Sequence, residues 1–249
     1  MANTIAVANH KGGVGKTSAV VNLGAAMAAK GKRVLLVDLD PQANLSQSLG
    51  VGGASPTVYD AIKGREDLTP IEVAPGLYVV PSSIDLSGAE VELSATPGRE
   101  YILRELLDPI AEGFDFVLID TPPSLGVLTI NALTAARSVL VPIQAHFLAL
   151  QGLDRMREVI DLVRKRLNRK LEIGGAFLTQ YDARRILNRD VAEALGKREG
   201  VHLFRTFIRD NIAIAEAPVR GLDIFRHAPH SAGASDFSDL AAEVVKLYK

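Results

Sequence analysis

The sequence predicts a doubly wound α/β fold, in which a mostly parallel, twisted sheet is flanked by helices on both faces. Short apolar runs alternate with longer stretches of helical periodicity along the 249 residues. The apolar runs are mostly continuous, as expected for strands of a parallel sheet that is covered on both sides. Polar, glycine-rich loops follow several of these runs, at the positions where open α/β sheets bind ligands.

The order of the expected elements follows from this alternation. The expected strands are residues 4–9, 33–40, 77–82, 114–123, 138–145 and 173–182, with 202–208 as a further candidate. The main expected helices are residues 16–30, 98–112, 150–167 and 186–198, with Gly31 just beyond the first. Because the chain shows no internal repeat and no Pro/Gly-rich linker, we expect residues 1–249 to form a single domain.

The composition excludes several classes of protein. Apolar residues make up 47% of the chain, which is enough for a sizeable core. With no cysteine, the chain cannot form disulfides, thiolate zinc sites or a Cys-ligated iron–sulfur cluster. No apolar run reaches the roughly 18 residues of a membrane span, and the N-terminus does not resemble a signal peptide. We therefore expect a cytoplasmic protein without a membrane partner.

A phosphate-binding loop of the P-loop type lies between the first strand and the first helix. Its sequence is HKGGVGKTS, residues 10–18. The glycines allow successive backbone N–H groups to turn inward, and the helix N-terminus adds partial positive charge. Lys16 would contact the β- and γ-phosphates, and the Thr17 hydroxyl would ligate Mg²⁺. The expected nucleotide-binding residues here are Lys11, Gly12, Gly13, Val14, Gly15, Lys16, Thr17 and Ser18.

The loop departs twice from the usual G-x-x-x-x-G-K-[ST] pattern. His10 stands where the first glycine is expected, and Lys11 adds a second lysine. A solvent-exposed surface lysine is one interpretation of Lys11. A second cation serving a phosphate is the other.

Acidic residues follow two of the apolar runs. Asp40 ends VLLVDLD and Asp120 ends FVLID, where a carboxylate can hold Mg²⁺ directly or through water. Asp38 has the same context two residues before Asp40, and strand alternation places both on one face. We prefer Asp40 as the functional acid because the strand becomes a loop there. The predicted metal ligands are Thr17, Asp40 and Asp120.

Together the three loops resemble the deviant-Walker ATPases of the ParA/Soj family, in the MinD/ParA superfamily. The motifs KGGVGKT, LLVDLDPQANLS and VLIDTPPSLG occur in the family's order and spacing. Further similarities, such as LTINAL, GLDR and AIAEAP, extend the resemblance from residue 4 to about residue 247. The resemblance implies a Mg²⁺-dependent ATPase that partitions chromosomes or plasmids.

The resemblance also assigns roles. It implies that Lys11 reaches across a homodimer to the partner's ATP, so that two chains sandwich two nucleotides. The catalytic residues would be Lys11, Lys16 and Asp40, with Asp40 positioning the attacking water. Residues 40–50 would sense the γ-phosphate and residues 120–127 would form a second switch. The adenine would lie near Thr179 and Asp210.

A nucleoid-associated, non-specific DNA-binding activity follows from the same resemblance. Residues 151–220 carry 15 basic and 10 acidic residues, which fits a basic face. The family's second DNA-binding arginine corresponds to Ala213 here, so one phosphate contact is missing. The expected DNA-binding residues are Arg184, Arg185, Arg189, Arg205, Arg209 and Arg220. A ParB-like protein would stimulate hydrolysis and release the dimer from DNA.

Three other functions remain open. A related ATPase could position a protein cargo on the nucleoid. A MinD-like ATPase could bind membranes through the tail DFSDLAAEVVKLYK, although its acidic residues favour a helix packed on the sheet. A metabolic P-loop enzyme would need a general base. His10 is the only histidine in the three loops, while His146, His202, His227 and His230 are interpreted as structural or surface residues.

Overall fold

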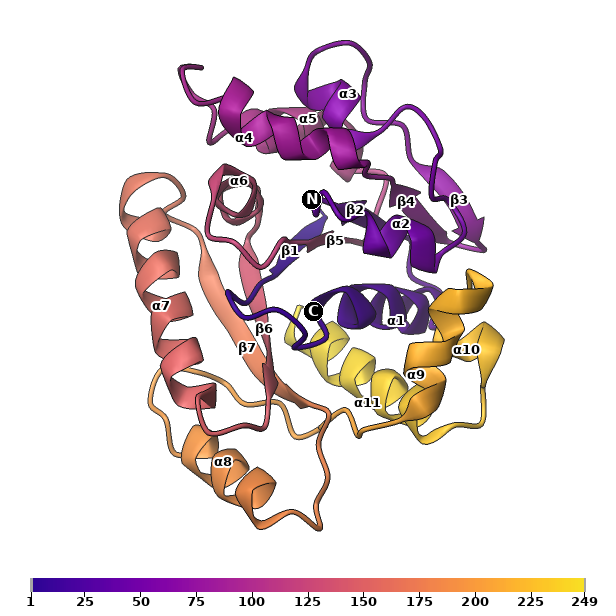
Figure 1. Ribbon diagram of the computed structural model, residues 1–249, viewed down its shortest axis with the longest axis vertical. Coiled ribbons are helices and arrows are strands. Elements are labelled where there is room, and N and C mark those ends of the chain that lie inside the picture. The colour runs from indigo at the N-terminus through magenta and orange to yellow at the C-terminus, as the bar shows by residue number, and fades with distance from the viewer. Residues whose placement is uncertain (1, 249) are drawn as a thin grey trace.

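A seven-stranded sheet forms the centre of the protein (Figure 1). The computed structural model describes residues 2–248. The strand order is β3-β4-β2-β5-β1-β6-β7, and all neighbours are parallel except β3 and β4. The strands are β1 (Asn3–Val7), β2 (Val34–Asp38), β3 (Ile71–Ala74), β4 (Leu77–Val80), β5 (Phe116–Asp120), β6 (Ser138–Gln144) and β7 (Glu172–Thr179).

Helices cover both faces of the sheet, as Figure 1 shows. One face carries α1 (Lys16–Ala29), α2 (Asn44–Ser48), α9 (Ile212–Glu216), η2 (Ala217–Arg220), α10 (Ile224–His227) and α11 (Ala232–Leu247). The other carries α3 (Val58–Ile62), η1 (Ile84–Gly88), α4 (Ala89–Glu92), α5 (Ile102–Ala111), α6 (Val127–Ala135), α7 (Ala149–Arg166) and α8 (Ile186–Gly196). The doubly wound α/β prediction is therefore confirmed.

The strand alternation divides the interior into two apolar cores. In β1, Ile5 and Val7 face the core beneath α1 and α11, whereas Ala6 faces the core beneath α6 and α7. Successive side chains of a strand point to opposite faces, so the continuous apolar runs supply both cores at once. This explains why these runs do not alternate in polarity.

The C-terminal helix α11 packs beside α1. Phe237, Leu240 and Val244 are fully buried on its inner side, at most 2% exposed. The prediction of a final helix packed onto the body of the protein is therefore confirmed. Within residues 2–248, no helix has the length and hydropathy needed to cross a membrane.

Three local features differ from the sequence-based expectations. Residues 202–208 do not form a strand, because they make only single bridges, Ala176 to Leu203 and nearby Tyr181 to Arg209. The short antiparallel strand β3 was not anticipated, since the stretch Ile71–Ala74 is short and carries a glutamate. The polar segment 40–56 contains the helix α2 rather than loop alone.

Candidate nucleotide-binding site

Three loops of the predicted site leave adjacent strands at one edge of the sheet. β5 lies between β1 and β2, and all three are parallel. Their carboxyl ends therefore place residues 8–15, 39–43 and 121–126 next to one another, as expected for a ligand site in an open α/β sheet. In the sheet, Asp120 of β5 pairs with Val7 of β1 on one side and with Asp38 of β2 on the other.

The phosphate loop adopts the conformation that its glycines permit. Gly13 and Gly15 have φ angles of 73° and 83°, in the left-handed region that costs other residues about 1–2 kcal/mol. Gly15 is also the N-cap of α1. The first N–H groups of α1 have no partners within the helix and are directed into the loop, where they can bind an anion.

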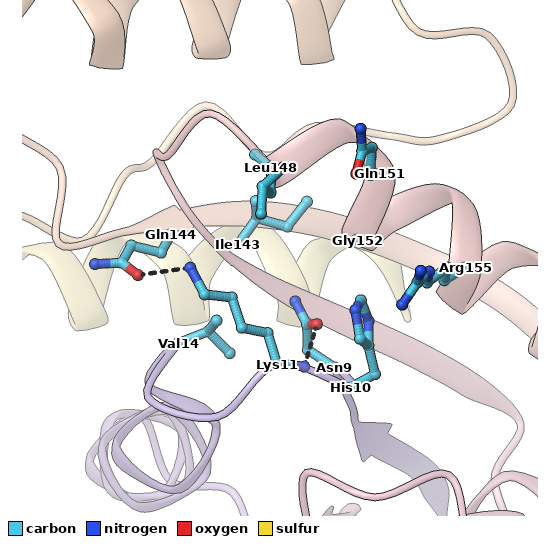
Figure 2. Close-up of a pocket in the computed structure, with 11 residues that line it drawn as sticks. Asn9, His10, Lys11, Val14, Ile143, Gln144, Leu148, Gln151, Gly152 and Arg155 are labelled. Atoms are coloured by element: carbon cyan, nitrogen blue, oxygen red, sulfur yellow. Dashed lines mark hydrogen bonds between the residues drawn. The ribbon is translucent and has the colours of Figure 1, made fainter.

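The two lysines of this loop point in different directions. Lys16 is 7% exposed, and its ammonium donates a 3.4 Å hydrogen bond to the carbonyl oxygen of Lys11. Burial lowers the pKa of Lys16, and the nearby carboxylates of Asp120 and Asp40 partly offset this effect. The Lys11 side chain instead extends toward β6, where its Nζ donates to Oε1 of Gln144 at 3.3 Å (Figure 2). Lys16 is thus available to a phosphate held by its own loop, whereas the Lys11 ammonium is bound to Gln144 at the end of β6.

Two fully buried carboxylates lie side by side at the ends of β2 and β5. Asp38 accepts hydrogen bonds from the Asp40 N–H at 3.2 Å and from the N–H and hydroxyl of Ser46 at 2.9 and 2.7 Å. Neither carboxylate oxygen of Asp120 makes a hydrogen bond, although the Thr17 hydroxyl is close enough to lower its pKa slightly. Burial raises the pKa of Asp38 to about 6, and it raises that of Asp120 well above the ordinary value, with a further contribution from Asp38.

The loop after β2 is tied to the loop after β4. The carboxylate of Asp40 accepts the Gln42 N–H at 3.0 Å, and its backbone carbonyl accepts the Ser82 hydroxyl at 2.9 Å. The N–H of Ser82 in turn donates to the Ser46 hydroxyl at 2.9 Å. Ser46 therefore connects α2, Asp38 and the β4 end in one network.

These oxygen atoms fit a magnesium ion that arrives with a nucleotide. Mg²⁺ is usually held by one or two carboxylates together with substrate phosphates and water, rather than by an all-protein cage. In agreement, the described residues contain no cluster of three or more His, Asp or Glu arranged as a metal cage. The two carboxylate oxygens of Asp120 lie close to the Thr17 hydroxyl and have no hydrogen-bond partner. Burying them in the ionised form without a cation costs free energy, so they are the ligand atoms that a magnesium ion would stabilise most.

The end of β7 approaches the phosphate loop from its other side. The Thr179 hydroxyl donates to the carbonyl oxygen of Val14 at 2.9 Å. Gln180, with a φ of 51°, donates from Nε2 to the Gly13 carbonyl at 2.9 Å and accepts a 2.7 Å bond from Gln144. The predicted residue Thr179 thus lies at the loop, and two glutamines connect the loop to β6.

The predicted residue Asp210 lies next to the arginines rather than to Thr179 itself. A hollow of about 570 Å³ is lined by Tyr181, Asp182, Ala183, Arg184, Arg185, Phe207, Arg209 and Asp210. Arg184 is held at its rim, because Nε and Nη2 donate to the Asp182 carboxylate at 3.0 and 2.9 Å while the side chain stays 91% exposed. Arg184 lowers the pKa of Asp182 to about 2. Arg189 donates to the Ala183 carbonyl beside this hollow.

The other predicted DNA contacts are not gathered at this place. Arg209 lines the hollow but forms a forked ion pair with Asp236 of α11, at 2.6 to 3.0 Å. Arg220 belongs to η2, which packs against α2 on the opposite side of the sheet from α8. Ala213, which stands where the family has an arginine, is 9% exposed within α9.

Several polar residues of the site were missed by the sequence analysis. Ser46 and Ser82 organise the acids, and Gln144 and Gln180 connect the two sides of the phosphate loop. Serines and amides in loops carry no distinctive sequence pattern, so nothing singled these four out. Asp38 did carry a signal, since strand alternation placed it on the same face as Asp40.

Comparisons with known proteins agree with this geometry. A family model described as an AAA domain matches residues 2–173. The chain is 45% identical over 249 residues to "Sporulation initiation inhibitor protein Soj" of Bacillus subtilis, covering 98% of each chain. It is also 45% identical over 248 residues to "Chromosome partitioning protein ParA" of Caulobacter vibrioides, covering 97% of this chain and 93% of that one.

A solved structure has the same fold. It is named as a cobyrinic acid a,c-diamide synthase from Mycobacterium smegmatis with a bound ATP analogue and magnesium, and it is 36% identical, with a TM-score of 0.89 over 100% of this chain and 96% of that one. The sequence motifs, the arrangement of the three loops and the near-complete similarity to Soj and ParA lead to one conclusion. This chain belongs to the ParA/Soj family of ATPases, in the MinD/ParA superfamily.

Proposed function

We propose that this protein is a DNA-partitioning ATPase that moves chromosomes or plasmids by an ATP-dependent cycle. ATP-bound chains pair as a sandwich dimer, the dimer binds duplex DNA without sequence preference, and hydrolysis releases it. A ParB-like partner stimulates the hydrolysis. The chain is 45% identical along nearly its whole length to the proteins named Soj and ParA, and the name of the second, a chromosome partitioning protein, supports the partition function. In the proposed cycle, residues 1–249 act as one nucleoid-associated domain.

The phosphate loop holds the triphosphate of MgATP. Backbone N–H groups from Gly12 to Ser18 surround the phosphates, and Lys16 moves from the Lys11 carbonyl to the β- and γ-phosphates. The Thr17 hydroxyl and Asp120 would hold the magnesium ion, which would supply charge neutralisation at the phosphates. Thr179 positions the loop, and the adenine lies toward the segment that contains Asp210.

Asp40 supports the attack of water on the γ-phosphate. It lies at the start of a loop, 7% exposed, and its carboxylate accepts only the Gln42 N–H among the described contacts. A carboxylate oriented in this way can hold the attacking water in line with the leaving ADP. Asp38, whose two oxygens are already occupied by Ser46 and the Asp40 N–H, stays as the support of this loop.

The direction of Lys11 is the single observation that carries the sandwich dimer. Its ammonium is 3.3 Å from Oε1 of Gln144 on β6 (Figure 2), whereas the Lys16 ammonium lies at the Lys11 carbonyl. A cation that does not serve its own phosphate site is available to the nucleotide of a second copy. Such a positive group supplied in trans can raise phosphoryl-transfer rates by about 10³–10⁵ in GTPases.

The DNA-binding surface is centred on Arg184, Arg185 and Arg189. Their positions at the beginning of α8 leave Arg184 and Arg185 exposed, at 91% and 61% of their side chains. Arg220 lies on the opposite side of the sheet in η2 and is not part of this surface, and Arg209 contributes less because it is paired with Asp236. Pairing two chains doubles this surface and raises the effective concentration of phosphate contacts.

Binding of random duplex DNA by the Asp40→Ala protein tests the cycle. At about 100 mM salt, where phosphate contacts still act, this variant should bind DNA with MgATP and not with MgADP, because blocked hydrolysis traps the dimer. The Lys11→Ala/Asp40→Ala double variant is the matched control. It should bind MgATP, stay monomeric in analytical ultracentrifugation and lose the DNA binding. An ATP-bound dimer of Asp40→Ala without affinity for DNA would contradict the partition function.

Two other functions are disfavoured by specific observations. A MinD-like membrane helix requires a free apolar face, but Phe237, Leu240 and Val244 of α11 are packed against the body of the protein. A diamide synthase, the name of the solved relative, acts on a small molecule, so its ATP hydrolysis would not respond to DNA. Steady-state ATPase assays with and without DNA separate this activity from partition.

A further inference from the structure

A second cationic site lies beside the phosphate loop, on the α7 side of the sheet. We propose that the cavity between the loop and α7, formed by His10, Lys11 and Arg155, binds a phosphate-bearing anion. The cavity has a volume of about 380 Å³, within the range of about 300–1,000 Å³ that is typical of small-molecule sites. It is separate from the magnesium site, which lies on the β5 and β2 side of β1.

The charge of the cavity wall is the first argument. Lys11 and Arg155 contribute two permanent cations, and no aspartate or glutamate is among the residues that line the cavity. Among residues 2–248 the structure shows no salt bridge from either side chain, and Lys11 donates only to the neutral amide of Gln144. Two cations that line one partly enclosed space, without an acidic residue among its lining, favour the binding of an anion there.

The arrangement of His10 and Arg155 is the second argument. In Figure 2 the guanidinium group of Arg155 is directed from α7 toward the His10 ring. Gly152 lies against that ring, since a Cβ at this position would lie 3.4 Å from Cε1 of His10, an ordinary contact distance. Arg155 follows Gly152 by three residues, so both lie on the same face of α7.

His10 also has an unused polar atom. Its Nδ1 is buried and makes no hydrogen bond in the structure. Burial lowers the pKa of His10, and Arg155, Lys16 and Lys11 lower it further, so every charged neighbour that acts on this ring is a cation. An anion in the cavity would compensate these cations and could accept a hydrogen bond from the ring.

Phosphate is the anion that these groups recognise best. Arginine presents a planar fork that matches phosphate oxygens, and lysine adds a compact point charge. The N-terminal end of α7, an 18-residue helix beginning at Ala149, adds partial positive charge at the same wall. Asn9, Gln144 and Gln151 supply neutral polar groups around the cations. The apolar floor of Val14 and Ile143 excludes water from one side.

The phosphate groups could come from two sources. One source is the triphosphate of a nucleotide bound to a second copy of the chain, in which case Arg155 and His10 join Lys11 in contacting it. This source rests on the proposed sandwich dimer. The other source is a free phosphorylated molecule that binds the monomer, and it does not depend on the dimer.

Pyrophosphate binding tests the site without the dimer. The full-length protein is first saturated with MgADP, so that its phosphate loop is filled, and is then titrated with inorganic pyrophosphate at constant free Mg²⁺ by isothermal calorimetry. Arg155→Gln should weaken this binding about tenfold or more, the loss of one charge-assisted hydrogen bond. Arg155→Lys should retain part of it. Arg164→Gln is the matched control, because Arg164 lies on the same helix but pairs only with Asp161.

Dimerisation distinguishes the two sources. This experiment uses the Asp40→Ala protein with MgATP, whose dimerisation is measured by sedimentation. If the second copy supplies the phosphates, Arg155→Gln should raise the dissociation constant of the dimer at least about tenfold, and Arg164→Gln should leave it unchanged. Weakening of pyrophosphate binding alone would assign the site to a free anion. Equal behaviour of Arg155→Gln and Arg164→Gln in both experiments would overturn the proposal. Failure of Asp40→Ala to dimerise would instead refute the proposed cycle, and the pyrophosphate titration would still decide the site.

Discussion

The buried carboxylates of Asp38 and Asp120 determine how the stability of the protein depends on pH. The pKa of Asp38 rises to about 6 on folding, from an ordinary value of 3.8. Between these pH values the folded chain keeps a proton that the unfolded chain has released, so the free energy of unfolding falls as the pH rises through this window. Asp120, whose pKa is also raised by burial, acts in the same direction.

The variant Asp120→Asn should therefore be more stable than the wild type at pH 8 in the absence of nucleotide and Mg²⁺. It replaces a buried carboxyl group whose oxygens make no hydrogen bond, with almost no change in shape. Each kcal/mol gained should raise the melting temperature by about 2–4 °C in a chain of this size. Thermal unfolding followed by circular dichroism in EDTA checks this.

The same measurement at pH 4 provides the internal comparison, since the advantage should shrink when the wild-type carboxyl is protonated. Asp67→Asn, at an exposed position, is the control and should leave the melting temperature almost unchanged. An Asp120→Asn protein no more stable than wild type at pH 8 would show that ionised Asp120 is compensated by neighbours.

Single residues were predictable where backbone chemistry restricts the choice. The left-handed φ angles of Gly13 and Gly15 and the strand-end position of Asp120 follow from local sequence alone. The roles of Gln144 and Gln180 could not be predicted, because they depend on a contact between residues 36 positions apart. An amide side chain fits so many surroundings that its type alone does not indicate a partner.

Among the secondary-structure elements, α11 is a helix whose buried face could be predicted from the spacing of its apolar residues. Its buried positions 237, 240, 241 and 244 recur at helical spacing and face α1. We expect Leu240→Ala to lower the free energy of unfolding by about 2–5 kcal/mol, the usual cost of a cavity in a packed core. Leu247→Ala, at a position 48% exposed, should cost about 0.5 kcal/mol or less. Urea denaturation of both variants measures the difference, and equal losses would refute the packing of this face.

The predictions from sequence were wrong about residues 202–208 and missed β3, two segments at the edges of the sheet. The stretch 202–208 has the composition of a strand but makes only the Ala176–Leu203 bridge, because Phe204 and Ile208 turn into the core beside α11 instead of extending the sheet. β3 is only four residues long, too short for a periodicity to be recognised. Long, fully buried strands were predictable because their apolar runs have no other stable environment.

The positive charge is distributed unevenly over the molecule, and the proposed DNA binding depends on this distribution. We expect Arg184→Glu to weaken binding to random duplex DNA without changing the ATP-dependent dimer. Each lost phosphate contact should reduce the slope of log K against log salt by about one unit per chain. Fluorescence anisotropy at several salt concentrations measures the slope, and sedimentation with MgATP measures the dimer.

The control for this prediction is Arg209→Glu, for which the stability of the fold is measured as well, because Arg209 is paired with Asp236. Its loss should lower stability more than it lowers the salt slope. An Arg184→Glu protein with wild-type DNA affinity at every salt concentration would move the DNA-binding surface away from α8. The global arrangement of these arginines was not predictable, since closeness in sequence did not imply a shared surface for Arg184 and Arg220.

Both edges of the sheet are closed to strand addition. At one edge β3 runs antiparallel and is only four residues long. At the other, the segment after α8 runs beside the end of β7 and makes the parallel bridges Ala176–Leu203 and Tyr181–Arg209. Exposed edges are the usual starting points for runaway polymerisation and amyloid, and short or covered edges prevent it. If the protein gathers on DNA as proposed, its copies can therefore reach a high local concentration and disperse again without fusing into a permanent fibre through their sheets.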